Sequence, residues 1–135
     1  MTYSQWVTVN VVNLLATPDL SIADAAVEWG KFHENGQPEV ELSSAAVEEV
    51  KIAPGTMESI SSCGREAALS GTFGWFSLYD GATQLCTITF DCPWGSKANR
   101  VSIGNKSTDH EIILDDYNRY DGPLGDIYVT VAKKP

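Results

Sequence analysis

The sequence predicts an all-β fold, a single antiparallel β-sandwich domain over residues 1–135. Three observations predict it. Apolar and polar residues alternate with a period of two, turn-forming residues separate these runs, and no segment shows a sustained helical period. With 43% hydrophobic and 20% charged residues, a chain of 135 residues suits one packed core.

The clearest strands alternate without interruption. In residues 5–15, Val7, Val9 and Val11 share one face, which indicates a strand with one buried side. The same pattern runs through residues 84–92 and 126–132. Weaker alternation predicts further strands at residues 22–32, 47–52, 57–63, 72–79, 100–103 and 110–115. Only residues 43–51 and 65–69 suit a helical turn instead.

Turn signals separate the predicted strands. They combine Gly with Pro, Asn or Asp, the residues that favour tight turns. They lie at residues 34–37, 54–55, 80–81, 104–105 and 121–123. Many short strands at this spacing are typical of a sandwich or barrel.

The charge restricts the possible partners. A formal net charge of −9 and a pI of about 4.5 repel nucleic acids and anionic lipid surfaces at long range, so we expect no nucleic-acid partner. A membrane partner should be neutral or zwitterionic. The first residues lack a basic segment followed by an apolar one, so we expect no cleavable signal peptide.

The three cysteines are Cys63, Cys86 and Cys92, and an odd number cannot pair completely within one chain. Their spacing matches no common zinc or redox motif. We expect buried free thiols, although one disulfide remains the alternative in an oxidising setting.

The sequence indicates no enzyme, no cofactor and no metal site. Its two histidines, His33 and His110, accompany no nucleophile elbow and no phosphate-binding loop. The acidic pairs at 48–49 and 115–116 are adjacent residues, whose side chains point to opposite faces of a strand.

Three predicted loops share one chemistry, a Gly beside a cation, at residues 29–31, 63–65 and 91–97. Lys31, Arg65 and Lys97 suit a phosphate headgroup, to which Ser96 can also donate a hydrogen bond. Trp94 suits a lipid–water interface or a choline-type cation.

The aromatic residues also have structural interpretations. Trp29 and Trp94 would then close the ends of the sandwich, with the loop cations solvated. Trp6 lies opposite Val7, which fits either packing at a sheet edge or an aromatic surface near a membrane. Trp75 lies in an aromatic cluster that favours the core.

Together these motifs resemble the aegerolysin family of small fungal and bacterial β-sandwich proteins. The similar segments are TYSQWV at residues 2–7, WGK at 29–31, CGR at 63–65, DCPWGSK at 91–97 and LG at 124–125. They cover nearly the whole chain in order, and DCPWGSK is the most specific of them.

The resemblance implies a non-enzymatic, secreted protein that acts at target membranes containing sphingolipid and sterol. Such proteins often form one half of a two-component cytolysin, whose larger perforin-like partner makes the pore, and some pairs are insecticidal. By this resemblance and the loop chemistry, the expected lipid-binding residues are Trp6, Trp29, Lys31, Arg65, Ser70, Trp94, Ser96 and Lys97.

One departure affects the choice of lipid. Some family members that recognise ceramide phosphoethanolamine carry Glu where this chain has Ser70, so their headgroup preference does not transfer directly. Glu66, Asp91 and Asp121 are alternative carboxylates. The competing function is a lectin-like sandwich that binds glycans or proteins through its exposed aromatic residues.

Overall fold

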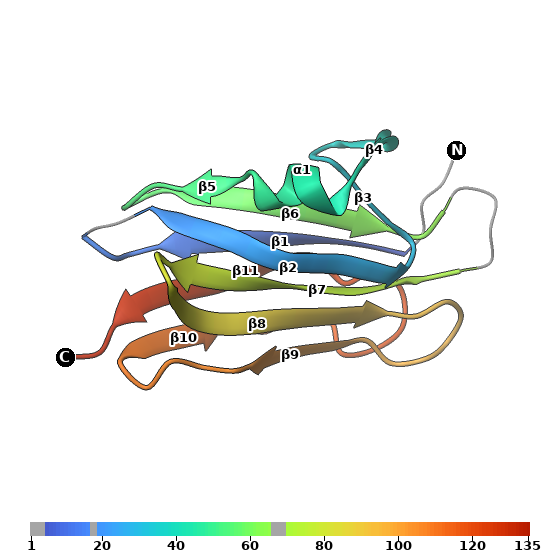
Figure 1. Ribbon diagram of the computed structural model, residues 1–135. Coiled ribbons are helices and arrows are strands. Elements are labelled where there is room, and N and C mark those ends of the chain that lie inside the picture. The colour runs from blue at the N-terminus through green and yellow to red at the C-terminus, as the bar shows by residue number, and fades with distance from the viewer. Residues whose placement is uncertain (1–4, 17–18, 66–69) are drawn as a thin grey trace.

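The alternating segments form two sheets that pack face to face (Figure 1). The computed structural model describes residues 5–16, 19–65 and 70–135. One sheet has six strands, in the spatial order β10 (His110–Leu114), β11 (Gly125–Lys133), β1 (Trp6–Asn13), β6 (Met57–Cys63), β3 (Lys31–Glu34) and β4 (Gln37–Leu42). The other has five, in the order β5 (Lys51–Ile52), β2 (Leu20–Trp29), β7 (Thr72–Asp80), β8 (Thr83–Cys92) and β9 (Arg100–Gly104).

The predicted sandwich is therefore confirmed, with one qualification about strand direction. Strands β1 and β11 run parallel, with Val7 opposite Gly125, whereas the other described strand pairs are antiparallel. The described residues contain no helix with the length and apolar character needed to cross a bilayer.

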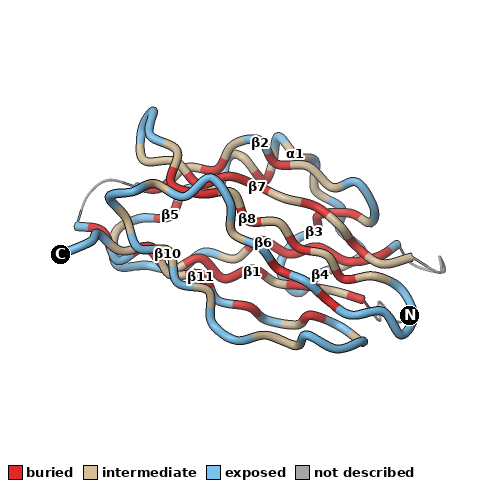
Figure 2. Tube along the Cα trace, turned by 90° about the horizontal axis from the view of Figure 1, so that it is seen from below, coloured by how far each residue is buried: buried red, intermediate tan, exposed pale blue. Residues whose placement is uncertain are grey.

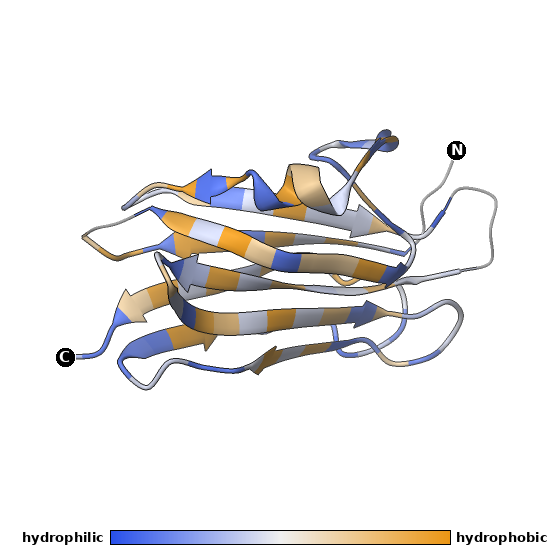
Figure 3. Cartoon of the chain, in the orientation of Figure 1, coloured by the Kyte–Doolittle hydropathy of each residue, from blue (hydrophilic) through white to orange (hydrophobic). Residues whose placement is uncertain are grey.

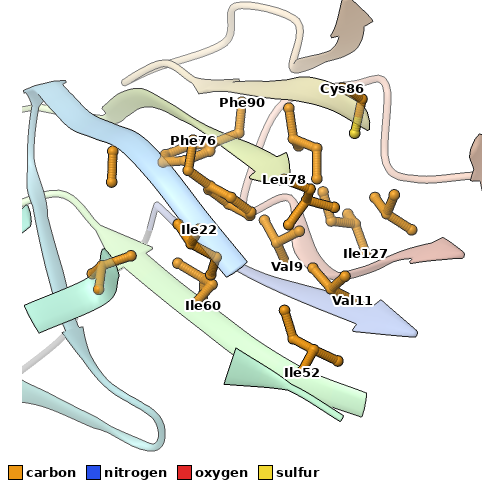
Figure 4. Packing of buried hydrophobic residues seen from close by; sticks show 14 of the residues in the cluster. Val9, Val11, Ile22, Ile52, Ile60, Phe76, Leu78, Cys86, Phe90 and Ile127 are labelled. Atoms are coloured by element: carbon orange, nitrogen blue, oxygen red, sulfur yellow. The ribbon is translucent and has the colours of Figure 1, made fainter. Parts of the chain in front are cut away.

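The core lies between the sheets and follows the predicted alternation. In Figure 3, apolar and polar bands alternate along β2 and β8, and in Figure 2 exposed residues gather in the connecting loops. Figure 4 shows Phe76, Phe90 and Val9 packing with Ile127 from facing strands, and all four are fully buried. Replacing either phenylalanine by Ala typically costs about 3–5 kcal/mol at such a fully buried position.

The prediction of one strand over residues 22–32 is wrong, because the chain changes sheets at Gly30. Strand β2 ends at Trp29 in one sheet, and β3 begins at Lys31 in the other. Gly30 has a φ of +86°, and a Cβ there would lie 2.5 Å from the carbonyl oxygen of Cys63. Only glycine suits both the left-handed backbone and this close approach.

The prediction of a strand over residues 47–52 is also wrong, and the helical alternative is confirmed. Helix α1 (Ser44–Glu48) begins at Ser43, whose hydroxyl accepts a hydrogen bond of 3.1 Å from the amide of Ala46. Val47 is its buried residue, and the short strand β5 follows. The other helical candidate, residues 65–69, lies almost wholly outside the described residues.

Strand β4 was not predicted. It is an edge strand that carries Pro38, Glu39 and Glu41, with mostly exposed side chains. Charges and proline are common on sheet edges, where they oppose pairing with another chain, but they remove the apolar alternation that marks a strand.

We expect Gly30→Ala to lower the free energy of unfolding by at least about 2 kcal/mol, because strain and steric overlap both oppose the new side chain. Gly36→Ala is the matched control: its φ is +75°, but no atom lies within 4 Å of the added carbon. That control should lose only about 1 kcal/mol. Urea unfolding measures both, and equal losses would contradict the steric part of the argument.

We also expect the native thiols to react slowly. Cys63, Cys86 and Cys92 are buried and free, and burial raises the pKa of Cys63 and Cys92 to about 11 and that of Cys86 to about 12. At pH 8 only about one thiol in a thousand is then the reactive thiolate. Ellman's reagent should react fully, with three equivalents per chain, only in denaturant. A fast native reaction or a count below three would contradict this structure.

Candidate functional site

All eight residues expected to bind lipid lie at one end of the sandwich. Strands β2, β6 and β8 end there, and β1, β3, β7 and β9 begin there, at the right-hand side of Figure 1. We call this end the tip and define it by residues 29–31, 63–65, 70–72, 92–99 and 115–124, together with the start of β1 at Trp6. The C-terminus lies at the opposite end (Figure 1).

Two glycines allow the tip segments to pack closely. A Cβ on Gly64 would lie 2.2 Å from the carbonyl oxygen of Ser70, and one on Gly71 would lie 2.0 Å from that of Cys92. The main chain of Ser70 therefore packs directly against Gly64 at the end of β6. The main chain of Gly71 packs in the same way against Cys92 at the end of β8. This close backbone approach explains the glycine of the CGR motif, Gly64, and also Gly71.

Two buried amide side chains hold the loop that carries Trp94. Gln5 donates hydrogen bonds to the carbonyl oxygens of Pro93 and Gly122. Asn99, at the other end of the loop, donates to Gly122 at 3.0 Å. Sequence reasoning missed both residues as part of the site, because nothing in the sequence distinguishes a buried amide from an exposed one.

The exposed tryptophans do not close the ends of the sandwich. Trp94 is 42% exposed and Trp29 is 61% exposed, so the interpretation of both as end plugs is wrong. The core assignment of Trp75 is wrong as well. It is half-buried on the outer face of the five-stranded sheet, where its ring contacts Phe73 at 5.8 Å, while Phe76 fills the core.

The tip residues divide between two faces. On the outer face of the six-stranded sheet, Trp6 and Lys31 lie on either side of the buried Cys63, in register with it. Trp29 lies on the outer face of the other sheet, where its ring contacts Phe73 at 5.8 Å. This division follows from the sheet change at Gly30. Lys31 is only 7% exposed, so it is not displayed to solvent as a free headgroup ligand would be.

Arg65 is engaged by a carboxylate. It donates two hydrogen bonds to Glu41 on β4, at 2.9 and 3.1 Å, and both side chains are about half exposed. The bidentate contact with Arg65 holds the pKa of Glu41 below its ordinary value of 4.5. A lipid phosphate that binds Arg65 must therefore compete with Glu41.

Lys97 and Ser96 are exposed in the loop after β8, and the charge of Lys97 acts on Asp91. Burial raises the pKa of Asp91, while Arg100 and Lys97 partly oppose that rise. The loop cations thus form two groups: Lys31 and Arg65 act on Glu41, and Lys97 acts on Asp91.

The histidines make local contacts. His33 Nδ1 lies 2.7 Å from the carbonyl oxygen of Glu34, and burial lowers the pKa of His33. His110 Nδ1 lies 2.9 Å from the hydroxyl of Ser107, within the turn between β9 and β10. Across the part of the chain that the structure describes, no three His, Cys, Asp or Glu side chains converge as metal ligands would.

The fold and the tip define a β-sandwich protein that displays aromatic and basic loop residues at one end. Comparison with known families identifies it further. The family model named Aegerolysin matches residues 4–134, and the chain belongs to the aegerolysin family.

Curated relatives and solved structures agree with this assignment. Asp-hemolysin of Aspergillus fumigatus is 39% identical over 98% of this chain and 95% of its own length, and Ostreolysin A6 of Pleurotus ostreatus is 34% identical over 99% of each. The crystal structure of RahU protein in complex with a Tris molecule has a TM-score of 0.93 and 32% identity, covering 99% of this chain and 98% of its own. That of IP-1A from Alcaligenes faecalis has a TM-score of 0.88 and 33% identity, covering 98% and 94%. These relationships support a lipid-binding, cytolysin-related role.

The contact between Arg65 and Glu41 can be tested directly. We expect Glu41 to titrate below 4.5 by carboxyl NMR, and Arg65→Gln to move its midpoint upward, because the bidentate donor is lost. Because the pKa of Glu41 is lowered in the folded state, the ion pair stabilises the fold at pH values above 4.5. This stabilisation is lost as the pH falls through the lowered pKa. Solvent screening keeps that contribution below about 0.5 kcal/mol. Arg119→Gln is the control. An unchanged midpoint in Arg65→Gln would refute the ion pair.

Proposed function

We propose that this protein is the membrane-recognition subunit of a two-component pore-forming cytolysin. It binds membranes that contain sphingolipid and sterol, and it recruits a perforin-like partner that forms the pore. It acts outside the producing cell, at the membranes of target cells, with insect cells among the candidate targets. The exposure of Trp94 on a loop fixed by Gln5 and Asn99 is the observation that carries this proposal.

The chemistry of Trp94 suits a membrane interface. An indole ring is stable where one side meets apolar chains and the other meets water. A loop anchored by buried hydrogen bonds can present that ring without a large loss of conformational entropy on binding. Folding gains little from an exposed Trp in a turn, so binding explains it better.

The overall charge favours neutral or zwitterionic membranes. With a net charge of −9, the protein is repelled by anionic lipid surfaces at long range. The exposed Lys97 and Ser96 then provide local contacts to a headgroup phosphate after encounter. Because the tip is one end of an elongated sandwich, its sheet faces and far end remain accessible to a protein partner (Figure 1).

Vesicle sedimentation tests this proposal. The protein should sediment with vesicles of sphingomyelin and cholesterol, and Trp94→Ala and Lys97→Ala should each weaken that binding by about tenfold or more. Tyr128→Ala is the matched control, because Tyr128 is 41% exposed but lies on β11, away from the tip. That variant should bind as the original protein does.

The same vesicles test the second component. Loaded with a fluorescent dye, they should leak little with this protein alone and strongly when a perforin-like partner is added. No sedimentation with any neutral or zwitterionic vesicle would overturn the proposal. Release of the bound protein by free sugar would favour the lectin-like alternative, which the exposed Trp29 and Trp94 would also serve.

A further inference from the structure

A cavity of about 170 Å³ lies where the six-stranded sheet divides near one edge. Strand β3 pairs with β6 only as far as His33, which lies opposite Ser61. Immediately after His33 the register between β3 and β4 shifts, and in the described residues the pairing with β6 goes no further. Helix α1 lines the space beside β6 through Ala46 and Val47. The lining residues of this cavity lie outside the tip.

The cavity has an apolar part that suits a small ring. Its apolar side chains come from β4, α1, β6 and the segment after α1, and they are Leu42, Ala46, Val47, Val50 and Ile60. In another protein an apolar cavity of about 150 Å³ takes up one benzene molecule. The volume beside β6 is therefore large enough for a single six-membered ring.

The polar part is organised by Asn35, in the turn between β3 and β4. Its amide nitrogen donates to the carbonyl oxygen of Ser59 at 3.1 Å, and its Oδ1 accepts from the hydroxyl of Ser61 at 2.7 Å. The hydroxyl of Ser59 donates to Oδ1 of Asn10 at 2.6 Å. These contacts tie the β3–β4 turn to β6 across the gap, and they occupy the polar groups of Asn35 and both serines.

His33 leaves one ring nitrogen for a ligand. Its Nδ1 lies 2.7 Å from the carbonyl oxygen of Glu34, and because a carbonyl oxygen only accepts, Nδ1 carries the proton. Burial lowers the pKa of His33 and so favours the neutral ring, in which Nε2 is an acceptor. No hydrogen bond within the described residues uses Nε2. The one fully buried side-chain nitrogen or oxygen without a partner there is Asn99 Oδ1, so Nε2 is accessible although His33 is only 7% exposed.

We propose that this cavity binds a small neutral aromatic alcohol of the phenol type, whose ring packs against the apolar wall and whose hydroxyl donates a hydrogen bond to Nε2 of His33. The exposed carboxylate of Glu34 in the same lining, and that of Glu39, which acts on His33, disfavour anionic ligands. A ligand of either charge would also lose solvation against the apolar wall. This site is separate from the tip and does not depend on membrane binding.

Phenol itself tests the ligand class. In a titration followed by amide NMR, phenol should shift the signals of Val47 and Ile60 to saturation, whereas benzoate, which is anionic, should not. Absence of saturable phenol shifts at these residues would overturn the site. Equal binding of benzoate and phenol would overturn the assignment to a neutral ligand.

His33→Phe tests the hydrogen bond, with toluene as the reference ligand because it matches phenol in size but has no O–H donor. The variant should weaken phenol binding about three- to tenfold, the range for one neutral hydrogen bond, and should not weaken toluene binding. Retained toluene binding also shows that the cavity is intact. His110→Phe is the control for changing a histidine elsewhere. An unchanged ratio of phenol to toluene affinity in His33→Phe would overturn the role of Nε2.

A pair of alanine substitutions on α1 tests the location. Ala46→Leu places a larger side chain in the cavity and should abolish phenol binding. Ala45→Leu makes the same change at the preceding residue, which is exposed and outside the cavity lining, and should bind phenol as the original protein does. Equal phenol binding by the two variants would place the ligand elsewhere and overturn the proposal.

Discussion

The crossing of the chain at Gly30 is the constraint on which the rest of the tip depends. One residue takes the chain from the five-stranded sheet to the six-stranded sheet, with its Cα facing the carbonyl oxygen of Cys63 and the side chain of Thr72. The Thr72 hydroxyl donates to the carbonyl oxygen of Trp29, and it also contacts the hydroxyl of Ser62. The two sheets are thereby joined at the end where the loops gather.

Because the crossing is so short, it also determines which face each tip residue occupies. Trp29 and Lys31 are neighbours in the sequence, yet one lies on each outer face of the sandwich. One face places Lys31 and Arg65 near the carboxylate of Glu41, and the other places aromatic rings beside Asp91. The tip therefore combines the exposed Trp94 loop with two different polar groups. One is the set of cations near Glu41 on one face, and the other is Asp91 beside the aromatic rings on the other face.

Sequence reasoning succeeded where one physical rule decides the structure. Strand β8 begins one residue before its predicted start and ends at the predicted Cys92, because apolar-in and polar-out alternation specifies register directly. It failed at Gly30, since a glycine in a strand pattern does not reveal a positive φ or a change of sheet. It also failed at β4, where charges on an edge strand conceal the pattern. The fold brings the segments that carry the loop motifs to one end, but the division between faces depends on packing that no local pattern contains.

Asp91 shows how burial and stability conflict at the tip. Burial raises its pKa above the ordinary value of 3.8, so the folded protein holds this proton more tightly than the unfolded chain does. The resulting stabilisation is present below 3.8 and is lost as the pH rises through the raised pKa. At neutral pH the ionised carboxylate therefore opposes folding, and among the described residues no ion pair within 4.0 Å offsets that cost, although Arg100 and Lys97 reduce it electrostatically.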